Sequence, residues 1–107
     1  MIKVDFYRDS SGVPRAKSDA QQHLVADFLE SDVQGDSTLC RELIHRLTHA
    51  TSGWEWVGNA HSMVLNNDNV YIAGLFEDEQ EFAINVQELV GLLINWLSFL
   101  QNHTQNT

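Results

Sequence analysis

The feature that most constrains the fold of this chain is the apolar segment at residues 86–100. At the helical period of 3.6 residues, its apolar side chains cover more of the helix surface than one stripe, which predicts a helix buried on most of its circumference. Asn85, followed by Glu88 three residues later, is typical of a helix N-terminus. Gln87, Glu88 and Asn95 interrupt the segment, which is too short and too polar to cross a bilayer. We therefore expect it to be the central core helix.

Two earlier segments show the narrower apolar stripe of amphipathic helices. The first is predicted to begin at Ser18, whose hydroxyl can cap free backbone N–H groups with Gln21 completing a capping box, and to end at Gly35. The second is predicted to begin at Asp36 or Ser37. The stripes consist of Leu24, Val25, Phe28 and Leu29 in the first segment and of Leu39, Cys40, Leu43, Ile44 and Leu47 in the second.

Strand signals flank these two segments. Apolar and polar residues alternate, and short turns rich in Asp, Asn, Ser and Gly separate the alternating stretches, as in antiparallel hairpins. The element order ββααβββα predicts one α+β domain over residues 1–107, with an antiparallel sheet of about five strands and three helices on one face. The predicted strands are residues 3–8, 13–17, 54–65, 70–76 and 81–84.

The single cysteine, Cys40, excludes an internal disulfide and fits a reducing compartment. Its place in an apolar helical stripe predicts a buried, unreactive thiol. Residues 1–15 mix charged with apolar side chains and build no apolar stretch of the kind found in signal peptides. These observations predict a cytoplasmic protein.

Electric charge is distributed unevenly along the chain. It holds 15 acidic and 6 basic residues, and every Lys and Arg lies at or before Arg46. The seven acidic residues after Arg46 give the rest of the chain a formal charge of −7 out of a total of −9. Such a surface repels nucleic acid and phosphate ligands and attracts basic proteins, so we expect no nucleic-acid partner. These acidic residues are Glu55, Asp68, Glu77, Asp78, Glu79, Glu81 and Glu88.

The densest group of carboxylates consists of Glu77, Asp78, Glu79 and Glu81. It is either a solvated turn whose charges protect a sheet edge from aggregation, or a contact surface for a cationic protein. Asp68, at the neighbouring predicted hairpin tip, would extend that surface. The residues alone leave both interpretations open.

Aromatic residues gather in the strand-like region. Alternation places Trp54 and Trp56 on one face of a strand and Glu55 on the other. Tyr71, on the following strand, can pair across the strand with this region. Aromatic side chains are enriched both in cores and at interface hot spots, so the pattern does not select which of these rings is exposed.

Residues that could carry catalysis are sparse. His45 and His49 are spaced to face the same side of a helix and could hold zinc, yet Arg46 occupies the place where the zinc-protease pattern requires Glu. Cys40 or His61 would have to approach as a third ligand. Neither a nucleophile elbow nor a phosphate-binding glycine loop is present in the sequence. We expect no catalytic, cofactor or metal site, with a metal-dependent enzyme as an alternative.

The opening residues 6–13, FYRDSSGV, resemble the start of the YacL-like family of small bacterial proteins. The likeness continues through the sequence ADFL at residues 26–29, through Trp54 followed by Gly58, and into the closing apolar helix. In members of this family an acidic segment precedes the final helix, and here it is shortened to residues 76–81. The resemblance implies neither an established activity nor catalytic residues.

The chain is also similar to the YacL-related immunity proteins of contact-dependent growth inhibition, which protect a bacterium from toxin domains delivered by its neighbours. Several of these toxins are nucleases, including RNase A-like ribonucleases with cationic active sites. The resemblance implies a small, acidic, non-enzymatic cytoplasmic protein that binds its toxin domain as a heterodimer. A YacL-like housekeeping protein, forming a homodimer through residues 86–100, is the alternative.

Charge and resemblance together predict one mechanism. A ribonuclease attracts RNA with cationic side chains, and an anionic protein can occupy the same field and exclude the substrate. Carboxylates would then supply speed and specificity, while buried aromatic rings would hold the complex together. The predicted toxin-binding residues are Glu77, Asp78, Glu79 and Glu81, with Asp68, Trp56 and Tyr71 as secondary contacts.

Overall fold

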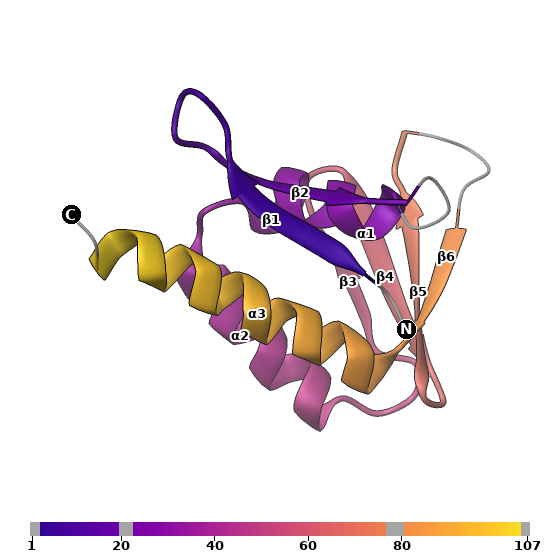
Figure 1. The fold of residues 1–107 in the computed structure, drawn as a ribbon. Coiled ribbons are helices and arrows are strands. Elements are labelled where there is room, and N and C mark those ends of the chain that lie inside the picture. The colour runs from indigo at the N-terminus through magenta and orange to yellow at the C-terminus, as the bar shows by residue number, and fades with distance from the viewer. Residues whose placement is uncertain (1–2, 20–22, 77–80, 106–107) are drawn as a thin grey trace.

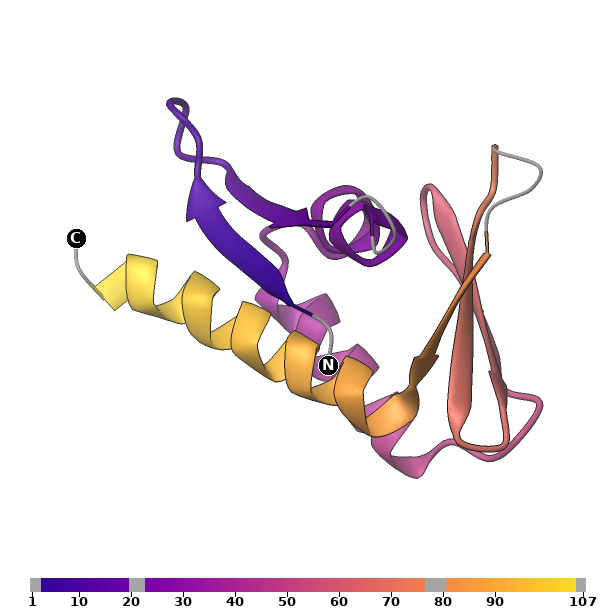
Figure 2. The same cartoon turned by 45° about the vertical axis from the view of Figure 1, so that its right-hand side comes forward.

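The helices pack against one face of a four-stranded antiparallel sheet, and a separate two-stranded hairpin packs against the helices (Figures 1 and 2). The computed structural model describes residues 3–19, 23–76 and 81–105. This part of the chain contains six strands and three α-helices, the first of which continues into a π-helix. The elements are β1 (Val4–Arg8), β2 (Pro14–Ser18), α1 (His23–Phe28), η2 (Leu29–Val33), α2 (Ser37–His49), β3 (Glu55–Val57), β4 (His61–Asn66), β5 (Asn69–Gly74), β6 (Glu81–Asn85) and α3 (Val86–Gln105).

The predicted α+β class is confirmed, but the number of strands differs. The stretch 54–65 was predicted as one strand and forms two, β3 and β4, joined by a turn at Gly58. The N–H of Gly58 donates to the carbonyl of His61 at 2.8 Å. A Cβ at position 58 would overlap the indole of Trp56 and lie 3.0 Å from Cγ of Asp32. Only glycine therefore lets the chain reverse this tightly here.

The hairpin β1–β2 does not join the larger sheet, contrary to the prediction of a single sheet. Phe6 in β1 instead packs on α3, with its ring 5.1 Å from that of Trp96 and 5.7 Å from that of Phe99. The prediction that Ser18 begins a helix is also wrong. Ser18 pairs with Val4 as the last residue of β2, because the hairpin register keeps it extended.

The first helical segment changes its geometry at Leu29. In η2, the N–H of Gln34 donates to the carbonyl of Leu29 at 2.7 Å, one residue further back than in an α-helix. The predicted stripe is confirmed, because its four apolar side chains are all buried. The carbonyl of Gln34 accepts the indole N–H of Trp96 at 2.8 Å, which ties this turn to α3.

Helix α3 is the core helix that its apolar surface predicts. Leu89, Leu93 and Trp96 are fully buried, and α3 lies alongside α2 (Figure 1). Asp36 caps α2 as predicted, since its carboxylate accepts the N–H of Leu39 at 3.0 Å. Within the described residues, neither α3 nor any other helix has the length and hydropathy needed to cross a bilayer.

Candidate protein-binding face and an acceptor-lined pocket

The larger sheet has one face that no other described element covers (Figure 2). The strands run in the order β3-β4-β5-β6, and side chains alternate between the core and this outer side. Val57, on the edge strand β3, is 67% exposed, and Val64, on the neighbouring strand β4, is 38% exposed. We call this surface the open face; its side chains are those of Glu55, Val57, Ser62, Val64, Asn66, Asn69, Tyr71, Ala73, Glu81, Ala83 and Asn85.

The open face has an anionic rim and no basic residue among its described side chains. Glu55 lies on β3 and Glu81 on β6, the two edge strands, and both residues are exposed. The remaining side chains are apolar or neutral. Exposed apolar side chains beside carboxylates are complementary to a protein whose apolar contact is flanked by Lys or Arg.

The structure separates the two aromatic residues predicted to bind the toxin. Tyr71 lies on the open face, in one row with Glu55 and Val64. Trp56 lies on the core face, where it pairs with Met63 and its ring meets that of Phe28 edge-on at 5.8 Å. Strand β4 lies between β3 and β5, and the register places Glu55, rather than Trp54 or Trp56, in the row of Tyr71.

The acidic residues are also separated. Asp68 lies in the turn between β4 and β5, beside the pair of Asn69 and Asn85, whereas Glu81 pairs with Ala73 at the other end of the strands. Successive turns of an antiparallel meander lie at opposite ends of the sheet, so Asp68 does not extend the acidic cluster. The other predicted contacts, Glu77, Asp78 and Glu79, lie outside the described residues.

The residues considered for metal or thiol chemistry do not come together in one site. The rings of His45 and His49 are 4.5 Å apart on α2, and the carbonyl of His45 lies 2.9 Å from Nδ1 of His49. Cys40 is fully buried, with Sγ 3.3 Å from the carbonyl of Leu93, and burial raises the pKa of its thiol to about 11. Within ranges 3–19, 23–76 and 81–105, no three His, Cys, Asp or Glu residues are placed to hold a metal ion.

A buried pair of ionisable residues, Asp32 and His61, joins the helical layer to the sheet. The Asp32 side chain is fully buried in η2. One carboxylate oxygen accepts the N–H of Ala60 at 2.7 Å, and the other lies 2.8 Å from Nδ1 of His61. The ring of Phe28 meets the imidazole edge-on at 6.3 Å. These contacts fix the orientation of the His61 ring.

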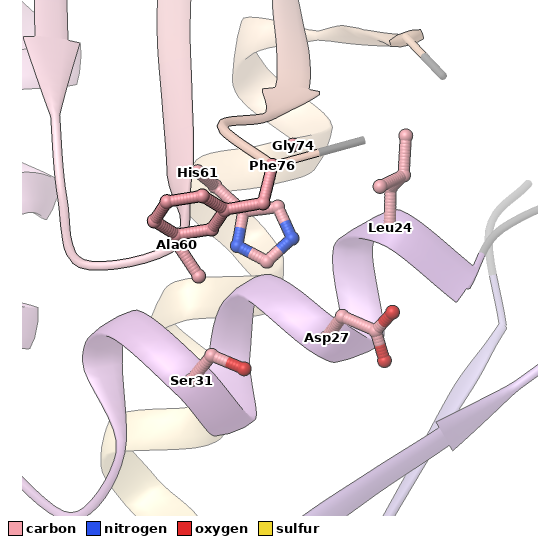
Figure 3. A pocket seen from close by; sticks show the side chains of 7 residues that line it. All are labelled: Leu24, Asp27, Ser31, Ala60, His61, Gly74 and Phe76. Carbon is pink, nitrogen blue, oxygen red and sulfur yellow. The ribbon is translucent and has the colours of Figure 1, made fainter. Parts of the chain in front are cut away.

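The imidazole of His61 lines a cavity of about 180 Å³ between the helical layer and the sheet (Figure 3). Leu24, Asp27 and Ser31 project from the continuous α1–η2 helix, and His61 and Phe76 lie above Asp27 and Ser31 in this view (Figure 3). Phe76 is 81% exposed at this site. We call this cavity the acceptor pocket; it is lined by Leu24, Asp27, Ser31, Ala60, His61, Gly74 and Phe76.

The sequence prediction missed the acceptor pocket, since it considered His61 only as a distant metal ligand. The spacing of Leu24, Asp27 and Ser31 does indicate a shared helix face. Nothing in the sequence indicates that His61 meets this face, because Asp32 and His61 are 29 residues apart.

In comparisons with known proteins, no protein family, curated protein or solved structure matches the chain. The resemblance to YacL-like and immunity proteins therefore stays a prediction, and function is argued from the surface of the molecule.

Proposed function

We propose that this protein is a cytoplasmic immunity protein that binds and neutralises a basic nuclease toxin of contact-dependent growth inhibition. The observation that supports the proposal best is the open face. Val57 and Val64 expose apolar surface on β3 and β4, and the face carries Glu55 and Glu81 on its two edge strands with no basic residue among its described side chains. Uncovered apolar area of this kind is typical of a protein-binding surface.

The chemistry of the face supports a cationic partner. A nuclease holds RNA phosphates with Lys, Arg and His side chains, and the same groups attract carboxylates. Long-range attraction of this kind raises association rates by about 10- to 10³-fold. The exposed valines and Tyr71 then supply the apolar contact that slows dissociation. Glu77, Asp78 and Glu79 remain predicted contacts of this partner.

The direct test is a cleavage assay with the toxin domain encoded next to this protein's gene. We expect stoichiometric loss of RNA cleavage as the protein is added. Replacing Val57→Lys and Val64→Lys together should weaken inhibition at least about tenfold, because each adds a like charge to the contact and removes apolar area. Ile94→Lys is the matched control, since Ile94 is equally apolar and 50% exposed but lies on α3. Full cleavage at saturating protein would refute the proposal.

A housekeeping protein that forms a homodimer is the second candidate, and the open face also favours it, because a second copy could cover Val57 and Val64. The apolar residues of 86–100, which motivated this alternative in the sequence, pack largely inside the core. Two copies would also bring like charges together, since each carries a net charge of −9. Sedimentation distinguishes the candidates: a stable dimer disrupted by Val64→Lys would favour the homodimer.

A further inference from the structure

We infer that the acceptor pocket binds the guanidinium group of an arginine side chain presented by the partner. The inference rests on the proposed function in one respect: the arginine is taken to belong to the basic protein that the open face binds. The pocket itself is defined by residues that the sequence prediction did not assign. Its polar groups suit a ligand that donates hydrogen bonds and carries a positive charge.

His61, whose ring lines the pocket, is 5% exposed. In the neutral imidazole, the hydrogen bond to Asp32 keeps the proton on Nδ1 and leaves Nε2 as an acceptor. The ring lines the pocket, and Nε2 has no hydrogen-bond partner among the described residues. The acceptor Nε2 is thus available to a ligand that brings an N–H group.

The other polar groups of the pocket are acceptors too. The Asp27 carboxylate can only accept hydrogen bonds when ionised, and it adds a negative charge at the pocket. The Ser31 hydroxyl, four residues further along the same helix, has two acceptor lone pairs. The Ser31 hydroxyl can also donate, whereas the Asp27 carboxylate and Nε2 of His61 only accept, so a ligand with several donors and a positive charge satisfies these groups together.

The apolar walls select arginine over lysine. Leu24 and the exposed ring of Phe76 offer surfaces on which a flat group can stack. A guanidinium is planar, weakly hydrated, carries five N–H donors and stacks on aromatic faces, whereas an ammonium is compact and strongly hydrated. The volume of about 180 Å³ lies below the roughly 300–1,000 Å³ of small-molecule sites, so it suits the end of one side chain.

The test uses Nα-acetyl-arginine-N-methylamide as the probe, titrated into the isotope-labelled protein by NMR. We expect saturable shifts of the backbone amides of Ala60, His61 and Gly74. The citrulline analogue has nearly the same shape without the charge and should bind at least about fivefold more weakly, as should the lysine analogue. Equal binding of the arginine and citrulline probes, or no shifts with arginine, would overturn the inference.

Variants locate the binding. Asp27→Asn should weaken binding of the arginine probe up to about fivefold, the loss expected for one exposed ion pair, and should leave the fold intact because Asp27 is exposed. Asp5→Asn is the control, since it also removes an exposed carboxylate but lies on β1, outside the pocket. An equal effect of the two substitutions would show nonspecific attraction and contradict the pocket.

The two proposals fail in different ways. If the arginine probe binds at the pocket but the toxin is not inhibited, the proposed function is wrong and the pocket stands. If the toxin is inhibited, the probe produces no shifts and Asp27→Asn inhibits like the unmodified protein, the pocket is not part of the interface and the inference falls.

Discussion

At the scale of single residues, Asp32 connects two parts of the chain that are distant in sequence. Its buried carboxylate holds both the N–H of Ala60 and the imidazole of His61. The turn at Gly58 leaves room for that carboxylate, since a Cβ there would lie 3.0 Å from Cγ of Asp32. One side chain thus determines the position of the β3–β4 turn and the orientation of a pocket residue.

The Asp32→Ala variant tests this role. We expect a loss of about 3–5 kcal/mol in the free energy of unfolding, because the change leaves His61 and the N–H of Ala60 buried without their partner. Urea denaturation measures this loss. Asp27→Ala removes a nearby but exposed carboxylate and should change stability by less than about 0.5 kcal/mol. Similar losses in both variants would contradict the assigned role.

Cys40 makes stability depend on pH at the alkaline end. Burial raises the pKa of its thiol from 9.0 to about 11 in the folded protein. Between these values the unfolded chain loses the proton and the folded chain keeps it, so stability falls as pH rises. The stabilising contribution is complete below pH 9.0, and the loss amounts to about 2 kcal/mol at about pH 11, close to its full value.

The measurement compares urea denaturation of the protein and of Cys40→Ala across this pH range. Tyr and Lys titrate in both proteins, so the difference between the two curves isolates the thiol. We expect that difference to shrink as pH rises through 9.0 towards about 11. A constant difference would show that the thiol titrates alike in the folded and unfolded chains.

At the scale of elements, the π-helix after α1 places two functions on one short segment. Its wider turn buries Asp32 against the sheet, while Ser31 lines the acceptor pocket. Single-turn π segments interrupt α-helices frequently at functional sites, which agrees with this placement. The turn is held at its C-terminal end by Gln34, whose carbonyl accepts the indole N–H of Trp96.

Two glycines in different elements should respond oppositely to alanine. Gly58→Ala should cost about 1–3 kcal/mol, because the added methyl overlaps the indole of Trp56. Gly91→Ala should stabilise by about 0.5–1 kcal/mol, since Gly91 lies within α3 and its Cβ would meet nothing within 4 Å. Thermal unfolding of both variants checks the prediction, and a gain in stability for Gly58→Ala would contradict the close packing of this turn.

At the scale of the whole molecule, the Lys and Arg side chains lie apart from the four-stranded sheet. Every Lys and Arg lies at or before Arg46, and the sheet strands that follow carry none. Lys3 precedes β1; Arg8, Arg15 and Lys17 lie in the hairpin; and Arg41 and Arg46 lie in α2. The sheet therefore turns its uncovered face to solvent with only carboxylates among its charged side chains. In the proposed complex, the field of these carboxylates would orient a basic partner toward that face.

Salt should weaken the association in a characteristic way. We expect the association rate with the basic toxin to fall on the order of tenfold between about 0.01 and 0.15 M NaCl, because the Debye length shrinks from about 30 to 8 Å. The dissociation rate should change far less, since it reflects short-range contacts. Surface plasmon resonance separates the two rates. An association rate independent of salt would show that the acidic surface does not guide binding.

Local patterns were enough to predict several elements. The apolar period of α3, the Asp36 cap of α2 and the hairpin β1–β2 follow from residues that are close in sequence, and the structure confirms all three. Ser18 illustrates the limit of such reasoning, because its hydroxyl could cap a helix while the pairing with Val4 keeps it in a strand. A long-range hydrogen-bond ladder here outweighs a local preference.

Local sequence and composition thus determined the fold class, the core helix and the sign of the net charge. The first two follow from the pattern of neighbours along the chain, and the net charge follows from composition alone. Tertiary structure alone decided that Trp56 faces the core while Tyr71 faces solvent, since strand register follows from pairing between strands. It also decided that Asp32 meets His61 beside a pocket. Contacts across 29 residues form only when the whole core packs, so no local pattern encodes them.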